Sequence, residues 1–109
     1  MELINRPRRL RQNGSIRRLC RETRLSPDSL IYPIFVDEKL KGRRAIPALA
    51  GQFHYGLDAV CEAVEECLQA GVGRCILFGL PERKDAVGSS AWDEHGVVQE
   101  AVRAIKARY

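Results

Sequence analysis

The residues best placed for chemistry lie in one polar loop, residues 81–92, which follows the apolar run 75–78. Near the end of this loop, Gly88, Ser89 and Ser90 could offer backbone N–H groups to an anion. The loop has neither the glycine-rich run nor the lysine of a phosphate-binding loop. Because functional residues in α/β folds follow the C-terminal ends of strands, this loop is the most site-like part of the sequence.

The other candidate ligands and nucleophiles are scattered along the chain. His54 stands apart from any cluster of His, Cys or carboxylate residues, which favours a structural role over catalysis. No two cysteines form a CxxC pair, and Cys61 and Cys67 are six residues apart on a predicted helix, which places them on different faces. We therefore expect reduced, buried cysteines that act as small apolar side chains. The cysteines are Cys20, Cys61, Cys67 and Cys75.

Two apolar runs predict the strands that would position the loop. Residues 74–78, closed by Gly79 and Pro81, predict a strand buried on both faces. Residues 30–36 predict a second strand. Pro33 lies in its middle and removes one ladder hydrogen bond, which indicates a strand end, a bulge or an edge.

Apolar residues at intervals of three and four predict two helices, residues 57–70 and 96–108, and Gly71 is placed to cap the first of them. A shorter helix is predicted over residues 16–24, with Ser15 as its N-cap. Ser26 and Pro27 predict the start of a further single turn. Residues 37–56 are polar, and we expect them to wrap irregularly over one end of the sheet.

The order strand, helix, strand, helix predicts an α/β fold with parallel strands joined by a right-handed crossover. Strands this apolar need cover on both faces or a closed barrel around them, and two strands supply neither. The sequence of 109 residues therefore predicts the opening portion of a larger barrel. No apolar run is long enough to cross a bilayer and no secretory signal is evident, so we expect a cytoplasmic protein that is not bound to a membrane.

Positive charge is concentrated at the N-terminus. Residues 1–24 contain eight arginines and two glutamates, a net charge of +6, whereas the whole chain carries +4. Such an arm could contact another subunit, bind nucleic acid through its phosphates, or remain a solvated tail. Protein contact is favoured, because apolar residues alternate with the arginines and no aromatic residue among the first 31 could stack on bases.

Four segments together resemble a known family. They are RPRRLR at residues 6–11, LSPDSLIYPIFV at 25–36, LFGLPERKDAVGSSAW at 77–92 and GVVQEAVRAIK at 96–106. In this order and spacing they are similar to the start of porphobilinogen synthase, also called delta-aminolevulinic acid dehydratase. The resemblance runs along essentially the whole chain and departs mainly at residues 46–55.

The resemblance implies a (β/α)₈ TIM barrel, of which this chain would hold an N-terminal arm, residues 1–24, and the first βα units, residues 25–109. It implies a hydro-lyase that condenses two 5-aminolevulinate molecules into porphobilinogen with loss of two waters, in heme and tetrapyrrole synthesis. One lysine of the family forms a Schiff base with substrate, and zinc or magnesium assists in many members. The family also implies a homo-octamer held by the arm.

None of the family's catalytic or metal-binding residues aligns with this chain, so we assign no catalytic, cofactor-binding or metal-binding residue here. The lysines present lie in polar loops or on an exposed helix, away from the apolar surroundings that would lower an amine pKa. Arg11 matches an arm arginine that lies near an allosteric metal at a subunit contact in some magnesium-dependent relatives. Two alternatives remain: a stand-alone α/β module that binds an anion or nucleic acid through the arginine arm, and a structural subunit that completes another chain's barrel. The lysines are Lys39, Lys41, Lys84 and Lys106.

Overall fold

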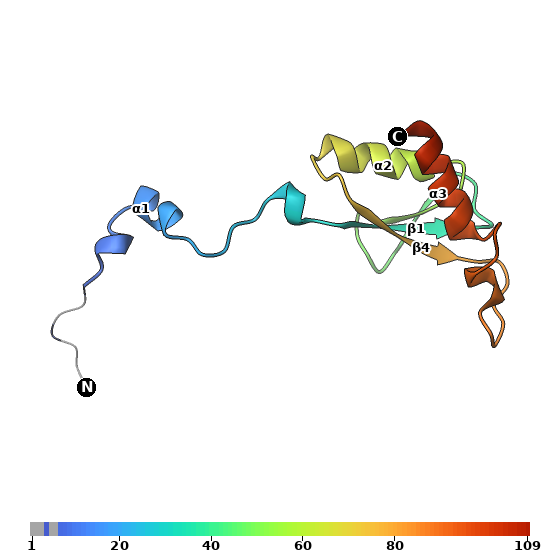
Figure 1. Cartoon of the computed structure of the whole chain (residues 1–109), viewed down its shortest axis with the longest axis horizontal. Coiled ribbons are helices and arrows are strands. Elements are labelled where there is room, and N and C mark those ends of the chain that lie inside the picture. Colours follow the sequence, from blue (N-terminus) through green and yellow to red (C-terminus); the bar gives the residue numbers. More distant parts are fainter. Residues whose placement is uncertain (1–3, 5–6) are drawn as a thin grey trace.

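A four-stranded sheet forms the centre of the chain in the computed structural model, which describes residues 4 and 7–109 (Figure 1). The strand order is β2-β3-β1-β4. β1 is parallel to both of its neighbours, and β2 is antiparallel to β3. The parallel pairing of β1 with β4 confirms the predicted arrangement of the two apolar strands. The strands are β1 (Tyr32–Asp37), β2 (Arg43–Ala45), β3 (Phe53–Tyr55) and β4 (Cys75–Leu80).

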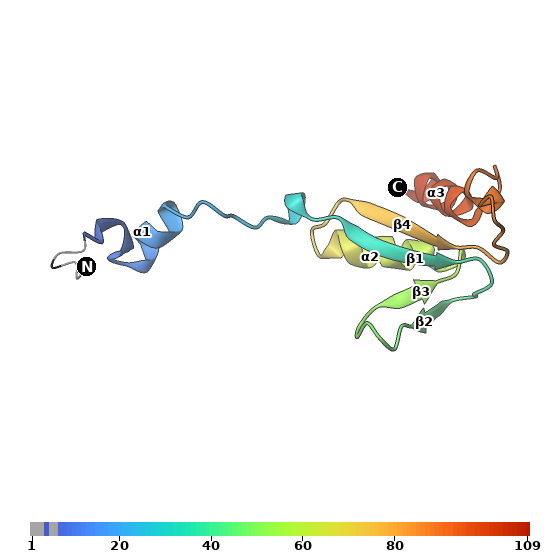
Figure 2. The same cartoon turned by 90° about the horizontal axis from the view of Figure 1, so that it is seen from below.

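Two helices, α2 (Val60–Gln69) and α3 (Val97–Arg108), cover one face of this sheet (Figures 1 and 2). The core lies between helices and sheet, where Ile34 and Val36 of β1 meet Val60 of α2 and Ala101 of α3, all fully buried. Both helices were predicted from the spacing of their apolar residues, and Gly71 follows α2 with a φ of 80°. This left-handed backbone conformation suits glycine, which has no Cβ to clash with the neighbouring backbone.

The N-terminal segment extends away from the sheet (Figure 2). It gives the chain a long axis of 68 Å and a radius of gyration of 21.8 Å, against about 13 Å for a compact domain of this length. The described part of this segment, from residue 7 onward, contains three short helical turns, and Ser26 Oγ accepts the Asp28 N–H at 3.3 Å as predicted for its cap. The turns are η1 (Arg9–Arg11), α1 (Gly14–Leu19) and η2 (Pro27–Ser29).

The predicted helix at residues 16–24 is wrong in both its start and its end. Asn13 caps α1, since its Oδ1 accepts the Ile16 N–H at 2.9 Å. The helix ends at Leu19, which is 75% exposed. A short helix gains most of its stability from packing an apolar face, and no residue of α1 is buried.

The prediction for residues 37–56 is also wrong, because this segment holds the hairpin of β2 and β3. Each strand has only three residues, too few to show an alternating pattern. The hairpin adds to the sheet through the pairing of β3 with Phe35 and Val36. The backbone N–H that Pro33 lacks would face the β3 side of β1, at a point where β3 has not yet begun. The internal strand β1 therefore accommodates the proline without losing a ladder hydrogen bond.

β4 is not buried on both faces, contrary to the prediction. It forms one edge of the sheet, and Ile76 and Phe78 are 48% and 46% exposed. The helices cover only the opposite face, where Leu77 packs against the core. The open face therefore carries apolar side chains without cover among the described residues.

Candidate functional site at the strand ends

The C-terminal ends of β1 and β4 lie side by side, with Asp37 opposite Leu80 in the parallel register. The chain leaves β1 through residues 38–42 and leaves β4 through the loop 81–92 (Figure 1). Parallel strands in one sheet place their following loops at the same edge, which is where α/β enzymes hold their reacting groups. The loop singled out from the sequence is therefore in the expected position.

The two exit segments are bonded to each other. The Glu82 N–H donates to Glu38 Oε2 at 2.5 Å, and Lys39 Nζ lies 3.1 Å from Glu82 Oε1. The Glu38 N–H donates to the carbonyl of Leu80, the last residue of β4, at 3.1 Å, which extends the ladder one residue past the end of β1. These contacts fix the beginning of the loop.

Asp85 organises the rest of the loop. Its Oδ1 accepts the N–H groups of Ser89 at 2.9 Å and of Val87 at 3.2 Å, and the Ser89 hydroxyl donates to Oδ2. These hydrogen bonds, first that from the Ser89 hydroxyl, lower the pKa of the Asp85 carboxyl. Gly88 has a φ of 65° inside this turn. Because the Ser89 N–H already faces a carboxylate, it is not available to an external anion.

A second cluster lies on the open face of the sheet, next to the end of β1. Asp37 Oδ2 pairs with Arg44 Nη2 at 3.0 Å, and the same Nη2 lies 3.4 Å from His54 Nδ1. The His54 ring meets Phe35 edge to face at 5.9 Å, and Phe35 stacks on Phe78 at 5.6 Å. The result is a patch of aromatic side chains bordered by the Asp37–Arg44 ion pair. In the sequence, the only signal of this cluster is the position of Asp37 at the end of a strand.

The neighbouring Arg43 points the other way. Its guanidinium lies 3.2 Å from Glu66 Oε1 on α2 and 4.7 Å from the centre of the Phe53 ring. Successive residues of a strand face opposite sides of the sheet. Of two adjacent arginines, therefore, one supports the helical face and the other the open face.

The cysteine prediction is right for one residue and wrong for two. Cys67 is buried, and burial raises the pKa of its thiol. Cys61 is half-buried, whereas Cys20 and Cys75 are exposed, because Cys20 lies in the projecting segment and Cys75 on the edge strand. Across residues 4 and 7–109, no three His, Cys, Asp or Glu side chains come together as metal ligands would.

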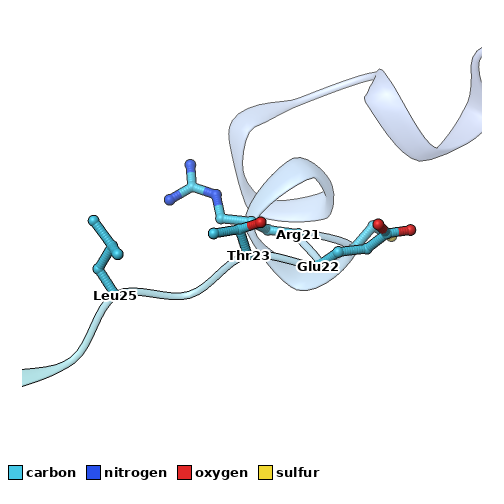
Figure 3. A pocket seen from close by; sticks show the side chains of 5 residues that line it. Arg21, Glu22, Thr23 and Leu25 are labelled. Atoms are coloured by element: carbon cyan, nitrogen blue, oxygen red, sulfur yellow. The ribbon is translucent and has the colours of Figure 1, made fainter. Parts of the chain in front are cut away.

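Arg11 lies in the projecting segment, where its carbonyl accepts a hydrogen bond from Arg17 Nη1 at 3.2 Å. A hollow further along the segment is lined by five consecutive or nearly consecutive residues, and the side chains of Arg21 and Glu22 point apart in it (Figure 3). A hollow made by one bend of the chain brings no distant groups together and offers no chemistry of its own. Its lining residues are Cys20, Arg21, Glu22, Thr23 and Leu25.

None of the helices that the structure describes is long and apolar enough to cross a membrane.

The family model of delta-aminolevulinic acid dehydratase matches residues 4–109. The chain belongs to this family. The dehydratase of Ruminiclostridium josui is 50% identical over 107 residues, which are 98% of this chain and 52% of that protein. The dehydratase of Halalkalibacterium halodurans is 47% identical over 106 residues, which are 97% of this chain and 32% of the relative. The chain thus spans between about a third and a half of the length of these curated relatives.

A solved structure of the same family shows the same fold. It is the delta-aminolevulinic acid dehydratase (porphobilinogen synthase) of Toxoplasma gondii ME49, in complex with the reaction product porphobilinogen. It is 29% identical, with a TM-score of 0.86 over 98% of this chain and 31% of that chain. The α/β arrangement described above is therefore that of a dehydratase, and the resemblance seen in the sequence is confirmed.

Proposed function

We propose that this chain is the N-terminal part of a porphobilinogen synthase, a hydro-lyase that condenses two 5-aminolevulinate molecules into porphobilinogen with loss of two waters. The observation that carries the proposal is the match of residues 4–109 to the family model, in the fold of a family member that binds the product. The reaction serves heme and tetrapyrrole synthesis, and we place it in the cytoplasm.

In this proposal, residues 25–109 form the first βα units of a TIM barrel, and residues 1–24 form a separate arm. The open face of the sheet would line the barrel interior, which suits its apolar Phe35 and Phe78. The exposed edge of β4 would accept the next parallel strand. Both features have a physical reason to be covered, because unpaired strand edges and apolar faces promote association.

The arm, on this view, holds a homo-octamer together by lying on a neighbouring subunit. Its apolar side chains support this role, since Leu10 and Leu19 are 64% and 75% exposed on a segment that extends away from its own domain. Arg11 would lie at such a subunit contact. Nucleic acid is not proposed as a partner.

Zinc or magnesium would assist the complete enzyme as a Lewis acid. The described residues of this chain do not fit such a site, since they bring no three candidate ligands together. The Schiff-base lysine is also placed outside this chain. Lys39, for example, pairs with Glu82 in a solvated position, unlike the desolvated pocket in which a Schiff-base lysine is held. We expect the chain to be inactive by itself.

The test is to purify the native gene product from its host and incubate it with 5-aminolevulinate and either zinc or magnesium. We expect porphobilinogen to form, and the chain alone to form none. A native product that yields no porphobilinogen with either metal would refute the proposal. Salt-sensitive binding of the arm to nucleic acid would then favour the stand-alone binding module.

A further inference from the structure

Glu38 joins the two segments that leave the sheet at the ends of β1 and β4. Its backbone N–H donates to Leu80 at 3.1 Å, and its carboxylate accepts the Glu82 N–H at 2.5 Å. One residue therefore binds the chain on both sides of Pro81, where the loop turns away from the sheet. Neither contact depends on the identity of a loop side chain, because both partners are backbone groups.

The other link between the two segments is weaker. Lys39 and Glu82 form an ion pair at 3.1 Å, but their side chains are 63% and 56% exposed. Ion pairs this exposed contribute little, because water screens them and two long side chains must be ordered. A hydrogen bond to an ionised acceptor is about twice as strong as a neutral one. Glu38 is exposed as well, but its contact orders only one side chain, because the Glu82 N–H belongs to the backbone. On that ground the carboxylate of Glu38 is the main attachment at the start of the loop.

The remainder of the loop is braced by its own contacts. Asp85 holds Val87 and Ser89, and the far end is anchored by Gln99, whose Nε2 donates to the Ala91 carbonyl at 2.8 Å. The loop is thus braced by internal hydrogen bonds and attached at both ends. Its placement over the strand ends depends on Gln99 at one attachment and on Glu38 at the other.

We propose that Glu38 is a positioning residue, which sets the loop 81–92 against the end of β1 so that the strand-end site has one geometry. It acts through the Glu82 backbone and does not itself contact substrate. The inference rests on the proposed function, since it takes these strand ends to be part of the active site.

Three variants separate this role from its alternatives. Glu38→Ala removes the acceptor, Glu38→Gln keeps an oxygen that can accept the same N–H, and Lys39→Gln breaks only the ion pair. Each is made in the native gene product and in this chain. The first measurement is the ¹⁵N–¹H NMR shift of the Glu82 amide in the chain, and the second is kcat and KM for porphobilinogen formation from 5-aminolevulinate by the native product.

Glu38→Ala should move the Glu82 amide and the resonances of residues 83–89, and it should lower kcat/KM on the order of tenfold. Glu38→Gln should restore most of both properties, and Lys39→Gln should leave both close to wild type. An unmoved Glu82 amide, full activity in Glu38→Ala, or a Gln variant as impaired as the Ala variant would each overturn the inference. If the native product makes no porphobilinogen, the proposed function fails, and the NMR shifts alone decide whether Glu38 holds the loop.

Discussion

Replacing Gly79 by alanine tests how closely β4 packs against α3. A Cβ at this position would lie 2.6 Å from Val98 Cγ2 and 2.8 Å from Val97 Cγ1. Carbon atoms prefer about 3.5–4.0 Å, so both contacts would be repulsive. Val97 is only 5% exposed and lies in the core, and a β-branched side chain in a helix has one preferred rotamer. The helix would have to move.

The size of the effect follows from two opposing terms. Overpacking a core costs about 1–3 kcal/mol. Replacing glycine by alanine recovers about 0.4–1 kcal/mol, because the unfolded chain has less freedom to lose. We therefore expect Gly79→Ala to lower the free energy of unfolding by about 1–2 kcal/mol. Each kcal/mol lost would lower the melting temperature by about 4–8 °C in a domain of this length.

The matched control is Gly73→Ala, because nothing lies within 4 Å of a Cβ there and its φ is not left-handed. It should be neutral or slightly stabilising. The assay is urea unfolding of both variants followed by circular dichroism, with the slope m compared to confirm the same unfolded state. If Gly79→Ala were as stable as Gly73→Ala, the close approach of α3 to β4 would be wrong.

Three further predictions follow from the core, the loop and the arm. Ile34→Ala should lower the free energy of unfolding by about 2–5 kcal/mol, because Ile34 is fully buried. Ile76 is 48% exposed, so urea unfolding should show a much smaller loss for Ile76→Ala. Equal losses in the two variants would refute the assigned core. Ser89→Ala should raise the pKa of Asp85 towards its ordinary value, as followed by NMR titration of the carboxyl carbon, whereas an unchanged pKa would contradict the hydrogen bonds of the loop. Since that pKa is lowered in the folded chain, the stabilisation is present above the unfolded value of about 3.9 and is lost as pH falls through the folded pKa. Deleting residues 1–24 from the native gene product should shift it to smaller assemblies in gel filtration, and an unchanged octamer would exclude the assembly role of the arm.

Several features were predictable because their determinants are local. The helices α2 and α3 follow from apolar residues spaced three and four apart, which give each a single face to bury. The strands β1 and β4 follow from continuous apolar runs, and the long helical connection between them makes them parallel. The position of the loop 81–92 at the strand ends follows from the same order of elements.

Other features depended on contacts between distant residues. The three-residue strands β2 and β3 carry no pattern of their own and exist because β3 pairs with β1. The start of α1 depended on which side chain, Asn13 or Ser15, reached a free N–H group. Likewise, Pro33 is tolerated inside the sheet only because β3 begins two residues further along β1.

The candidate site divides in the same way. The sequence by itself determined the family, the two apolar strands and the loop that follows the second, since motif and periodicity are properties of neighbouring residues. Only the tertiary structure decided that Glu38 holds that loop through Glu82, forty-four residues away, and that Arg44 rather than Arg43 meets Asp37. Those pairings arise from the strand register and from which face of the sheet the helices cover. Neither the register nor the covered face is encoded at any single position of the chain.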